Sequence, residues 1–331
     1  MTTDRLTGAS PAGSYAHTAS RDWENDRETP APCQDIASQL VRRQPGNKFR
    51  VVLGGGRKQF NNSEGRSDGR TVGSDLISEW LTERRDRGER CQYVSSNTQL
   101  EHTDTASLDS LLGIFTEDEF EYKLDVGEAT EQPRLAEMTA KAIDILSKGE
   151  EGFVLFVEAA HVDKAHHDNW AKKAVEEVLE LEAAVSVALN MTDSSSLLLV
   201  TADHSHSLTI SGYPRRHVDV LGYDGWPDSQ QRADDPQQSY YPTLMYSTGP
   251  GRRHGHYDVS MDDSILSKDY VAPATVYRES ASHQGEEVAL YATGPQSHLF
   301  RGLMDQHHIP HLLAYGACIG NGVTFCDDLQ N

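Results

Sequence analysis

Two apolar runs with an amphipathic helix pattern between them are the feature that most limits the folds open to this chain. Residues 152–157 (GFVLFV) and 196–201 (SLLLVT) are largely apolar, as expected of strands buried on both faces. Between them, apolar residues from Trp170 to Leu189 recur at helical spacing. Strand, helix, strand in this order is typical of parallel sheets with crossover helices. The sequence therefore predicts an α/β fold with a central, mostly parallel sheet flanked by helices.

Other segments support the same fold class. Helical spacing of apolar residues predicts three helices before the first run, at residues 33–43, 75–85 and 135–146. Strands are predicted at 49–53, which runs into three glycines, and at 288–292, with a closing helix at 309–317. Residues 213–280 are rich in Tyr, Pro, Gly and Asp and show little periodicity. We expect a single domain over residues 1–331 in which 213–280 form an irregular insertion.

Composition excludes two classes of protein. With 51 acidic and 30 basic residues, the formal net charge is −21, whereas a nucleic-acid binder needs a basic footprint. No run approaches the roughly 20 apolar residues of a membrane-spanning helix. The first residues lack the pattern of a signal peptide, and the last ones lack the hydrophobic tail of a glycolipid-anchor signal.

Acidic residues and histidines follow both apolar runs directly. Glu158, Asp163 and His167 come after the first run, and Asp203 and His204 follow the second. In open α/β sheets, ligands bind at the carboxyl ends of the strands. Carboxylate with imidazole is a zinc ligand set, whereas carboxylate with hydroxyl and water suits magnesium. A lone histidine would more often be an ordinary surface or core residue, but this concentration at two strand ends predicts a metal site.

Longer strings resemble the alkaline phosphatase family, most closely its animal members. They are FVEAAHVDKAHHDNWA, LVTADHSHSLTISGYP, VVLGGGRKQF and SHQGEEVALYATGPQSH, and the resemblance covers nearly the whole chain. It implies a central sheet flanked by helices with an irregular crown, to which residues 213–280 would correspond. It also implies hydrolysis of phosphate monoesters at alkaline pH through a phosphoserine intermediate.

The resemblance further implies two zinc ions and one magnesium ion, held by residues that match the family's metal ligands. The first zinc would be held by Asp163, His167 and His283. The second would be held in part by Asp203 and His204. The magnesium would be held in part by Ser10 and Glu158. Two zinc ions about 4 Å apart can stabilise both the attacking and the leaving oxygen of a phosphoryl transfer.

Four further residues match positions around these ligands. Arg21, in the string SRDW, would grip two phosphate oxygens through its planar guanidinium. His206 would orient the Asp163 carboxylate, and Lys164 and His166 would also lie near the metals. The family's calcium site would fall near Phe115 and Glu131, but Thr116 stands where a glutamate is expected.

One departure from the family bears directly on activity. The family's nucleophile is a serine in a D-S-A-x-T setting, and this sequence contains no such string. The aspartate that the family shares between zinc and magnesium is also absent. We therefore expect an N-terminally truncated chain that is inactive as given. The alternative is a non-catalytic relative that binds metal or phosphate; a phosphodiesterase or sulfatase with a related metal core fits the strings less well.

The remaining expectations concern processing and assembly. Cys318 and Cys326 are close enough in sequence to close a small disulfide, and they match the family's C-terminal pair. Asn61 and Asn190 begin glycosylation tripeptides. The resemblance implies an extracellular, cell-surface enzyme, anchored through a glycolipid in its relatives and usually a homodimer.

Overall fold

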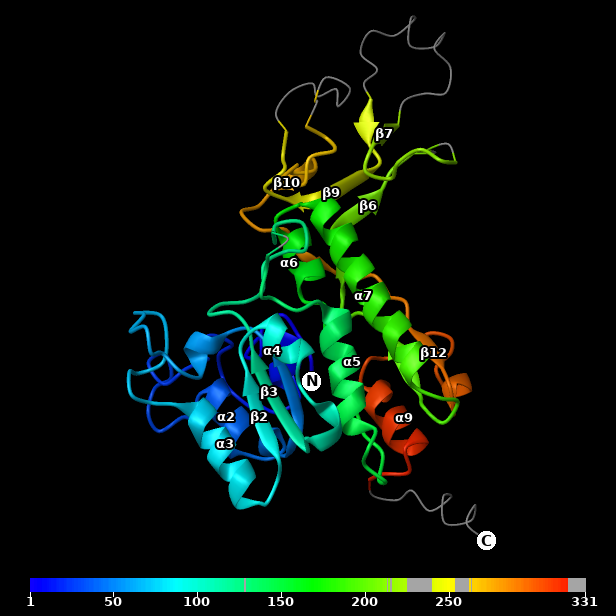
Figure 1. Cartoon of the computed structure of the whole chain (residues 1–331). Helices are drawn as coiled ribbons and strands as arrows, with labels where there is room; N and C mark the ends of the chain where they lie inside the picture. The colour runs from blue at the N-terminus through cyan, green and yellow to red at the C-terminus, as the bar shows by residue number, and fades with distance from the viewer. Residues whose placement is uncertain are drawn as a thin grey trace, which may run out of the picture. The chain divides into compact units, whose positions relative to one another are not determined.

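The computed structural model describes residues 1–127, 129–212, 214, 216–224, 240–253, 262 and 264–320 (Figure 1). The chain divides into two compact units. Unit 1 comprises residues 1–165, 170–188 and 263–270, and unit 2 comprises residues 166–169, 189–262 and 271–331. A single domain over residues 1–331 stays a prediction.

Unit 1 is built on a parallel three-stranded sheet. Its strands are β1 (Val51–Gly54), β2 (Cys91–Val94) and β3 (Ser110–Ile114), in the order β1-β3-β2. Val51 lies opposite Leu111 in one pair, and Cys91 lies opposite Ser110 in the other. The predicted α/β class with a parallel sheet is thereby confirmed.

Helices cover both faces of this sheet because alternate strand residues point in opposite directions. Val52, Leu112 and Ile114 pack with helices α2 (Ile36–Arg42) and α3 (Leu76–Asp86) in one buried cluster. The intervening strand residues, Val51, Leu53 and Leu111, pack with α5 (Leu135–Leu146) in a second cluster. The unit also contains α1 (Ala9–Gly13) and α4 (Asn97–Glu101).

Local signals fix the ends of these helices. Asp35 caps α2 by accepting a hydrogen bond from the Ser38 amide at 2.8 Å, and Asp75 caps α3 through the amides of Ile77 and Ser78. Such caps satisfy amides that have no partner inside the helix. The predicted helices at 33–43, 75–85 and 135–146 are confirmed, and α5 has the predicted limits.

The first apolar run differs from the prediction of a buried strand. Thr2 pairs with Val157 at the end of this run. The Thr2 amide donates to the Phe156 carbonyl and the Glu158 amide donates to the Thr2 carbonyl, both at 2.9 Å. Val154, however, is 80% exposed, and Phe153 and Phe156 are also exposed. The prediction of burial on both faces is wrong for this run. Apolar side chains favour burial, but burial also requires other side chains to pack over them. Among the described residues, the apolar side chains of this run stay exposed.

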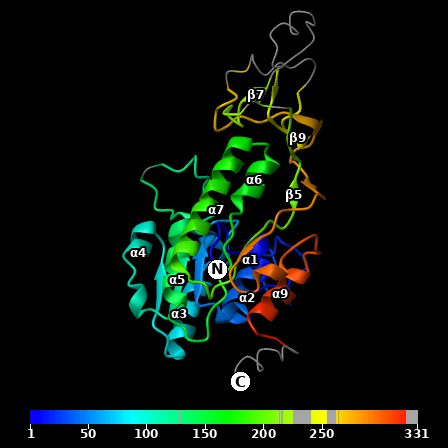
Figure 2. The same cartoon turned by 90° about the vertical axis from the view of Figure 1, so that its right-hand side faces the viewer.

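Unit 2 is made of short strands. Its largest sheet has the order β10-β9-β6, with β6 (Leu208–Ile210) antiparallel and β10 (Ala274–Tyr277) parallel to β9 (Leu244–Gly249) (β9 is labelled in Figure 2). Three two-stranded pairs accompany it: β4 (Leu198–Val200) with β12 (Tyr291–Thr293), β5 (Ser205–His206) with β11 (His283–Gln284), and β7 (Tyr223–Asp224) with β8 (Tyr241–Pro242). The helix α9 (His308–Gly316) confirms the predicted closing helix.

Two expectations about this part of the chain need correction. The second apolar run forms β4, which is half-buried and antiparallel to its partner, so it is not a strand buried in a parallel sheet. The stretch 213–280 contains the regular strands β9 and β10 in its described part. Short strands of mixed composition carry little periodicity, so the sequence pattern did not show them.

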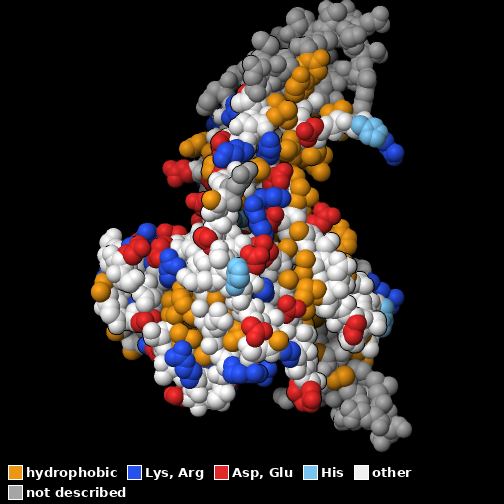
Figure 3. Space-filling model, in the orientation of Figure 1, with side chains coloured by type: hydrophobic (Ala, Val, Ile, Leu, Met, Phe, Trp, Pro, Cys, Tyr) orange, Lys and Arg blue, Asp and Glu red, His pale blue; other side chains and the backbone are white. Residues whose placement is uncertain are grey.

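Charged side chains of both signs lie on the surface, and the described helices are short or polar. Figure 3 shows acidic and basic side chains interspersed on the face drawn, without one large basic area among the described residues. Within the described residues, every helix is too short or too polar to span a bilayer. The helix α7 (Ala171–Met191) is the longest of those described.

Asp4 carries a buried carboxyl group in unit 1. Its side chain is buried and accepts a hydrogen bond from the His161 amide at 3.2 Å. Burial raises the pKa of Asp4 to about 7, and Glu177 and Glu158 add to the rise. Between pH 4 and 7 the unfolded chain loses this proton while the folded chain keeps it, so the Asp4 contribution to stability falls as the pH rises.

We expect Asp4→Asn to raise the free energy of unfolding at pH 8, by up to about 4 kcal/mol. Asparagine still accepts from His161 but cannot ionise. The gain should fall below about 1 kcal/mol at pH 4, where the folded carboxyl is protonated and the unfolded one, with an ordinary pKa of 3.8, is only partly ionised. Urea unfolding of metal-free protein at the two pH values measures the difference, with the exposed Asp104→Asn as control. Equal stability of the parent and Asp4→Asn at pH 8 would contradict the assigned pKa.

Candidate metal centre

Helix α6 (His161–His167) presents two of the predicted ligands on one face. Asp163 and His167 are four residues apart, which is about one helical turn. Their closeness follows from the helix itself. Just beyond the helix, Asn169 adopts a left-handed backbone conformation with φ of 57°, which asparagine tolerates better than most residues.

A short antiparallel pair supplies two further histidines. His206 on β5 and His283 on β11 are direct partners across the strands. Side chains of directly opposed residues lie on the same face, with Cβ atoms about 5 Å apart. The pairing therefore brings together two imidazoles that are far apart in the sequence.

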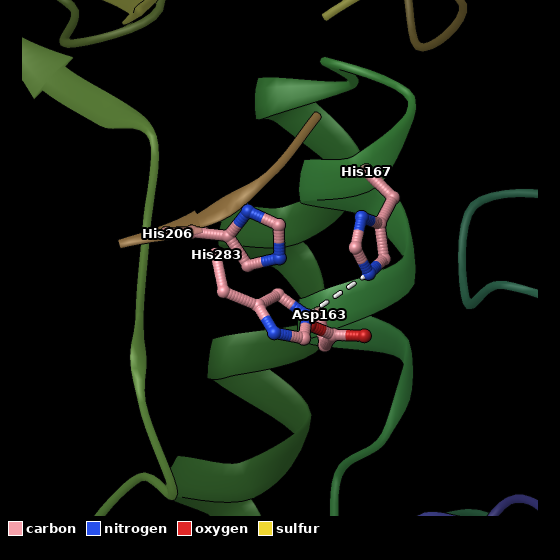
Figure 4. A group of neighbouring side chains, drawn as sticks. All are labelled: Asp163, His167, His206 and His283. Atoms are coloured by element: carbon pink, nitrogen blue, oxygen red, sulfur yellow. Dashed lines mark hydrogen bonds between the residues drawn. The ribbon is translucent and has the colours of Figure 1, made fainter. Parts of the chain in front are cut away.

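These side chains form a compact group of possible metal ligands. One ligand atom from each of Asp163, His167, His206 and His283 lies within 4.8 Å of the others (Figure 4). The Nε2 atoms of His167 and His283 are 3.1 Å apart. Two nitrogens bound at 2.0–2.1 Å to one tetrahedral zinc would be roughly 3.3 Å apart. The group therefore fits zinc in both donor chemistry and spacing.

His206 lies within the first group of candidate ligands. Its ring centroid is 4.7 Å from that of His167 and 5.1 Å from that of His283. Its nitrogen belongs to the group of four, so the geometry suits direct binding of a metal as well as orientation of Asp163. The expectation that it only orients Asp163 stays a prediction.

The residues expected at a second zinc lie beside His283. The His204 ring stacks on the His283 ring with centroids 3.6 Å apart. The His204 Nε2 atom is 3.4 Å from a carboxylate oxygen of Asp203. The Asp203 carbonyl accepts a hydrogen bond from the Gln306 side chain at 3.1 Å. A carboxylate and an imidazole are thus adjacent here too.

Lys164 and His166 have protein partners. Lys164 forms an ion pair with Glu119 in unit 1. In unit 2, the His166 Nδ1 atom is 2.8 Å from the hydroxyl of Tyr246, which is buried and whose pKa burial raises. The sequence pattern gave no signal for Tyr246, because it lies on β9, in the stretch expected to be irregular.

The remaining predicted site residues belong to unit 1. Glu158 accepts a hydrogen bond from the Thr3 hydroxyl and, within the described chain, is not part of the group of four. Ser10 is half-buried on α1, and Arg21 is exposed in the following loop. The roles expected for these three residues stay predictions.

Residues near the expected calcium site are engaged in other contacts. The Glu131 carboxylate accepts hydrogen bonds from the amide and hydroxyl of Thr98 at 3.1 and 3.0 Å. The Thr116 hydroxyl donates to the Asp118 carbonyl at 2.6 Å, and Phe115 is buried. These contacts give no independent support for calcium.

The processing sites differ in exposure. Asn190 is exposed near the end of α7, and Asn61 is half-buried and pairs with Asp75. Cys318 is disulfide-bonded, and its predicted partner, Cys326, lies outside the described residues. Cys33 and Cys91 are free thiols.

Comparison with known proteins points to one family. The family model of alkaline phosphatase matches residues 1–319. The chain is 38% identical to the membrane-bound alkaline phosphatase of Bombyx mori, over 98% of this chain and 61% of that protein. It is 36% identical to the tissue-nonspecific isozyme of Gallus gallus, over 98% of this chain and 64% of the relative. The chain thus spans about three fifths of the length of these relatives.

Solved structures agree at the level of the fold. A mutant of TAB5 alkaline phosphatase with magnesium bound has a TM-score of 0.63 at 18% identity, over 97% of this chain and 72% of that one. The cold-active enzyme of Shewanella sp. has a TM-score of 0.59 at 22% identity, over 94% and 74% of the two chains. The family match, the animal relatives and the shared fold agree with the resemblance seen in the sequence, and the chain belongs to the alkaline phosphatase family.

Proposed function

We propose that this chain supplies metal-binding residues of a phosphate monoester hydrolase. The observation that carries the proposal is the group formed by Asp163, His167, His206 and His283, whose ligand atoms lie within 4.8 Å of one another. Family membership supports the reaction class. The chemistry of the group supports zinc, because three imidazoles and a carboxylate are ligands that zinc prefers.

We assign the metals as follows. Asp163, His167 and His283 hold the first zinc, and Asp203 and His204 hold part of a second. Ser10 and Glu158 supply part of a magnesium site. Bound zinc would act as a Lewis acid that stabilises charge on phosphoryl oxygens.

The residues of the chain then have distinct tasks. His167 is oriented through its Nδ1 atom, which lies 2.6 Å from the Ala281 carbonyl, so its Nε2 atom faces the proposed metal. Arg21 is exposed and would bind two phosphate oxygens through its guanidinium. Lys164, paired with Glu119, would contribute positive charge near the substrate.

Metal binding and turnover can be measured separately. We expect the purified 331-residue chain to bind zinc, and to bind it less after His167→Gln. We expect no hydrolysis of p-nitrophenyl phosphate above the buffer rate, because the sequence has no D-S-A-x-T string to supply the nucleophile. Elemental analysis measures the metal, and absorbance of p-nitrophenol measures turnover. Steady turnover abolished by a chelator would overturn the expectation of inactivity.

The absent nucleophile string also favours a second candidate, a non-catalytic relative that binds metal and phosphate. It predicts that inorganic phosphate raises the melting temperature of the zinc-loaded chain and that Arg21→Lys weakens this effect. Lysine keeps the charge but cannot grip two oxygens at once. The absence of any phosphate effect would exclude this second candidate.

We also propose a substrate class, an assembly and a location, from the family resemblance. Phosphate monoesters are the proposed substrates, and a homodimer is the proposed assembly. A cell-surface location is supported by the name of the Bombyx mori relative, a membrane-bound alkaline phosphatase. Glycosylation at Asn190 would be compatible with its exposure.

A further inference from the structure

We infer that Thr248 on β9 is a positioning residue for the metal centre, where it holds the three histidine-bearing segments in register. The inference rests on the zinc centre proposed above. His167, His206 and His283 come from three segments that are distant in the sequence. Each of these segments has a polar residue, one or two positions from its histidine, that bonds to Thr248.

The Thr248 carbonyl joins two of the segments. It accepts a hydrogen bond from the Asn169 amide group at 3.2 Å and another from the Ser207 hydroxyl at 3.2 Å. Asn169 lies two residues after His167, and Ser207 directly follows His206. Ser207 is buried, and its carbonyl also accepts from the Ser247 amide at 2.8 Å.

The Thr248 hydroxyl joins the third segment. Its oxygen accepts a hydrogen bond from the Ser282 amide at 2.9 Å and lies 2.9 Å from the Ser282 hydroxyl. Ser282 directly precedes His283. Next to it, the Gln284 side chain donates to the Ser247 hydroxyl at 2.6 Å. The His283 segment is therefore fixed to β9 from both sides.

Asn169, just beyond α6, makes further hydrogen bonds besides the one to Thr248. It is fully buried, and its side-chain oxygen accepts from the Gly251 amide at 3.0 Å while its carbonyl accepts from the Ala272 amide at 2.9 Å. A Cβ atom added to Gly249 would lie 2.0 Å from the Asn169 oxygen. Glycine at 249 is thus required for this close approach.

These hydrogen bonds matter because the strands that carry His206 and His283 are too short to hold a stable position by their own pairing. β5 and β11 have two residues each, and an isolated two-stranded pair is marginally stable at best. The six-residue β9, held in a three-stranded sheet, provides the rigid support. Mutation of a group that is hydrogen-bonded directly to a metal ligand typically lowers metal affinity about 10- to 100-fold, and Thr248, which acts through residues beside the ligands, should have an effect at the lower end of this range.

The test compares zinc affinity in Thr248 variants. Thr248→Val keeps the shape of the side chain and the backbone carbonyl but removes the hydroxyl that accepts a hydrogen bond from the Ser282 amide. We expect zinc affinity to fall about 10-fold, measured by competition with a chelating dye. Thr248→Ser restores the hydroxyl and should restore the affinity. In the cobalt-loaded protein, the visible spectrum of Thr248→Val should differ from that of the parent, because the ligand geometry changes.

A matched control separates positioning from a general loss of stability. Thr209→Val removes an exposed hydroxyl of β6, in the same sheet, that donates to the Met245 carbonyl at 3.2 Å. It should leave affinity and spectrum unchanged. A Thr248→Val protein with the affinity and the cobalt spectrum of the parent would overturn the inference, even if its metal-free form melted at a lower temperature.

A second variant keeps the inference testable if Thr248→Val does not fold. Asn169→Gly retains a residue suited to the left-handed conformation and removes the amide bonded to the Thr248 carbonyl. We expect weaker zinc binding here too; parent-like affinity would count against the inference. His167→Gln separates the two proposals. If it retains zinc, the metal centre itself is wrong; if it loses zinc while both positioning variants do not, only the role of Thr248 fails.

Discussion

His167→Gln should lower the zinc affinity of the chain by roughly 100-fold. Structural zinc sites with four protein ligands have binding free energies of roughly 10–16 kcal/mol. On that scale the loss of one ligand costs about 3 kcal/mol, which corresponds to about 100-fold in affinity. His167 is suited to this test because its Nε2 atom is 3.1 Å from that of His283 and its other nitrogen faces the Ala281 carbonyl. Glutamine can keep that second contact while removing the imidazole.

Competition with a chelating dye at fixed pH measures this loss. His102→Gln is the control, because His102 is exposed at the end of α4 and its Nδ1 atom lies 2.8 Å from a backbone carbonyl of its own helix. The control should bind zinc as the parent does. Equal affinity of His167→Gln and His102→Gln would show that zinc binds elsewhere.

Arg70→Met should lower the free energy of unfolding by about 3–5 kcal/mol, because it leaves a buried carboxylate without its partner. The Arg70 side chain is 1% exposed and forms an ion pair with Asp35, which is 5% exposed. Arg70 also donates to the Gln59 carbonyl at 2.8 Å and to the Ser38 hydroxyl at 3.1 Å. Asp35 caps α2, so the pair connects a helix end to the loop that follows β1.

Urea unfolding followed by circular dichroism measures this loss. Arg90→Met is the matched control, since Arg90 forms an ion pair with Asp109 in which the two side chains are 64% and 37% exposed. Exposed pairs contribute about 0–1 kcal/mol. The double variant Arg70→Met with Asp35→Asn should recover part of the loss, because it removes the unpaired charge. A loss below 1 kcal/mol for Arg70→Met would contradict the role given to the buried pair.

Local patterns predicted the helices α2, α3 and α5 of unit 1, whereas the shorter α1 and α4 were not predicted. The limits of α5 agree with the predicted 135–146, and α3 begins directly after its capping residue, Asp75. Helical periodicity and capping are encoded within a few neighbouring residues, so they can be recognised without knowledge of the rest of the chain.

Strand partners were predicted less well. Residues 152–157 were expected to be buried, yet Val154 is 80% exposed, and β9 lies in a stretch expected to be irregular. Apolarity shows that a segment favours burial, but the residues that cover it, and the strand that pairs with it, come from other parts of the chain. Short mixed strands such as β9 carry too little periodicity to be recognised alone.

The candidate site divides in the same way between sequence and structure. The sequence by itself predicted the types of candidate ligand and the segments that carry them, since Asp163 and His167 are one helical turn apart and His283 lies in a recognisable family string. Only the tertiary structure showed that a His206 nitrogen lies within 4.8 Å of the other three candidate ligand atoms and that Thr248 joins the histidine-bearing segments. The reason is that those contacts depend on the register between segments distant in the chain, and no short-range pattern specifies that register.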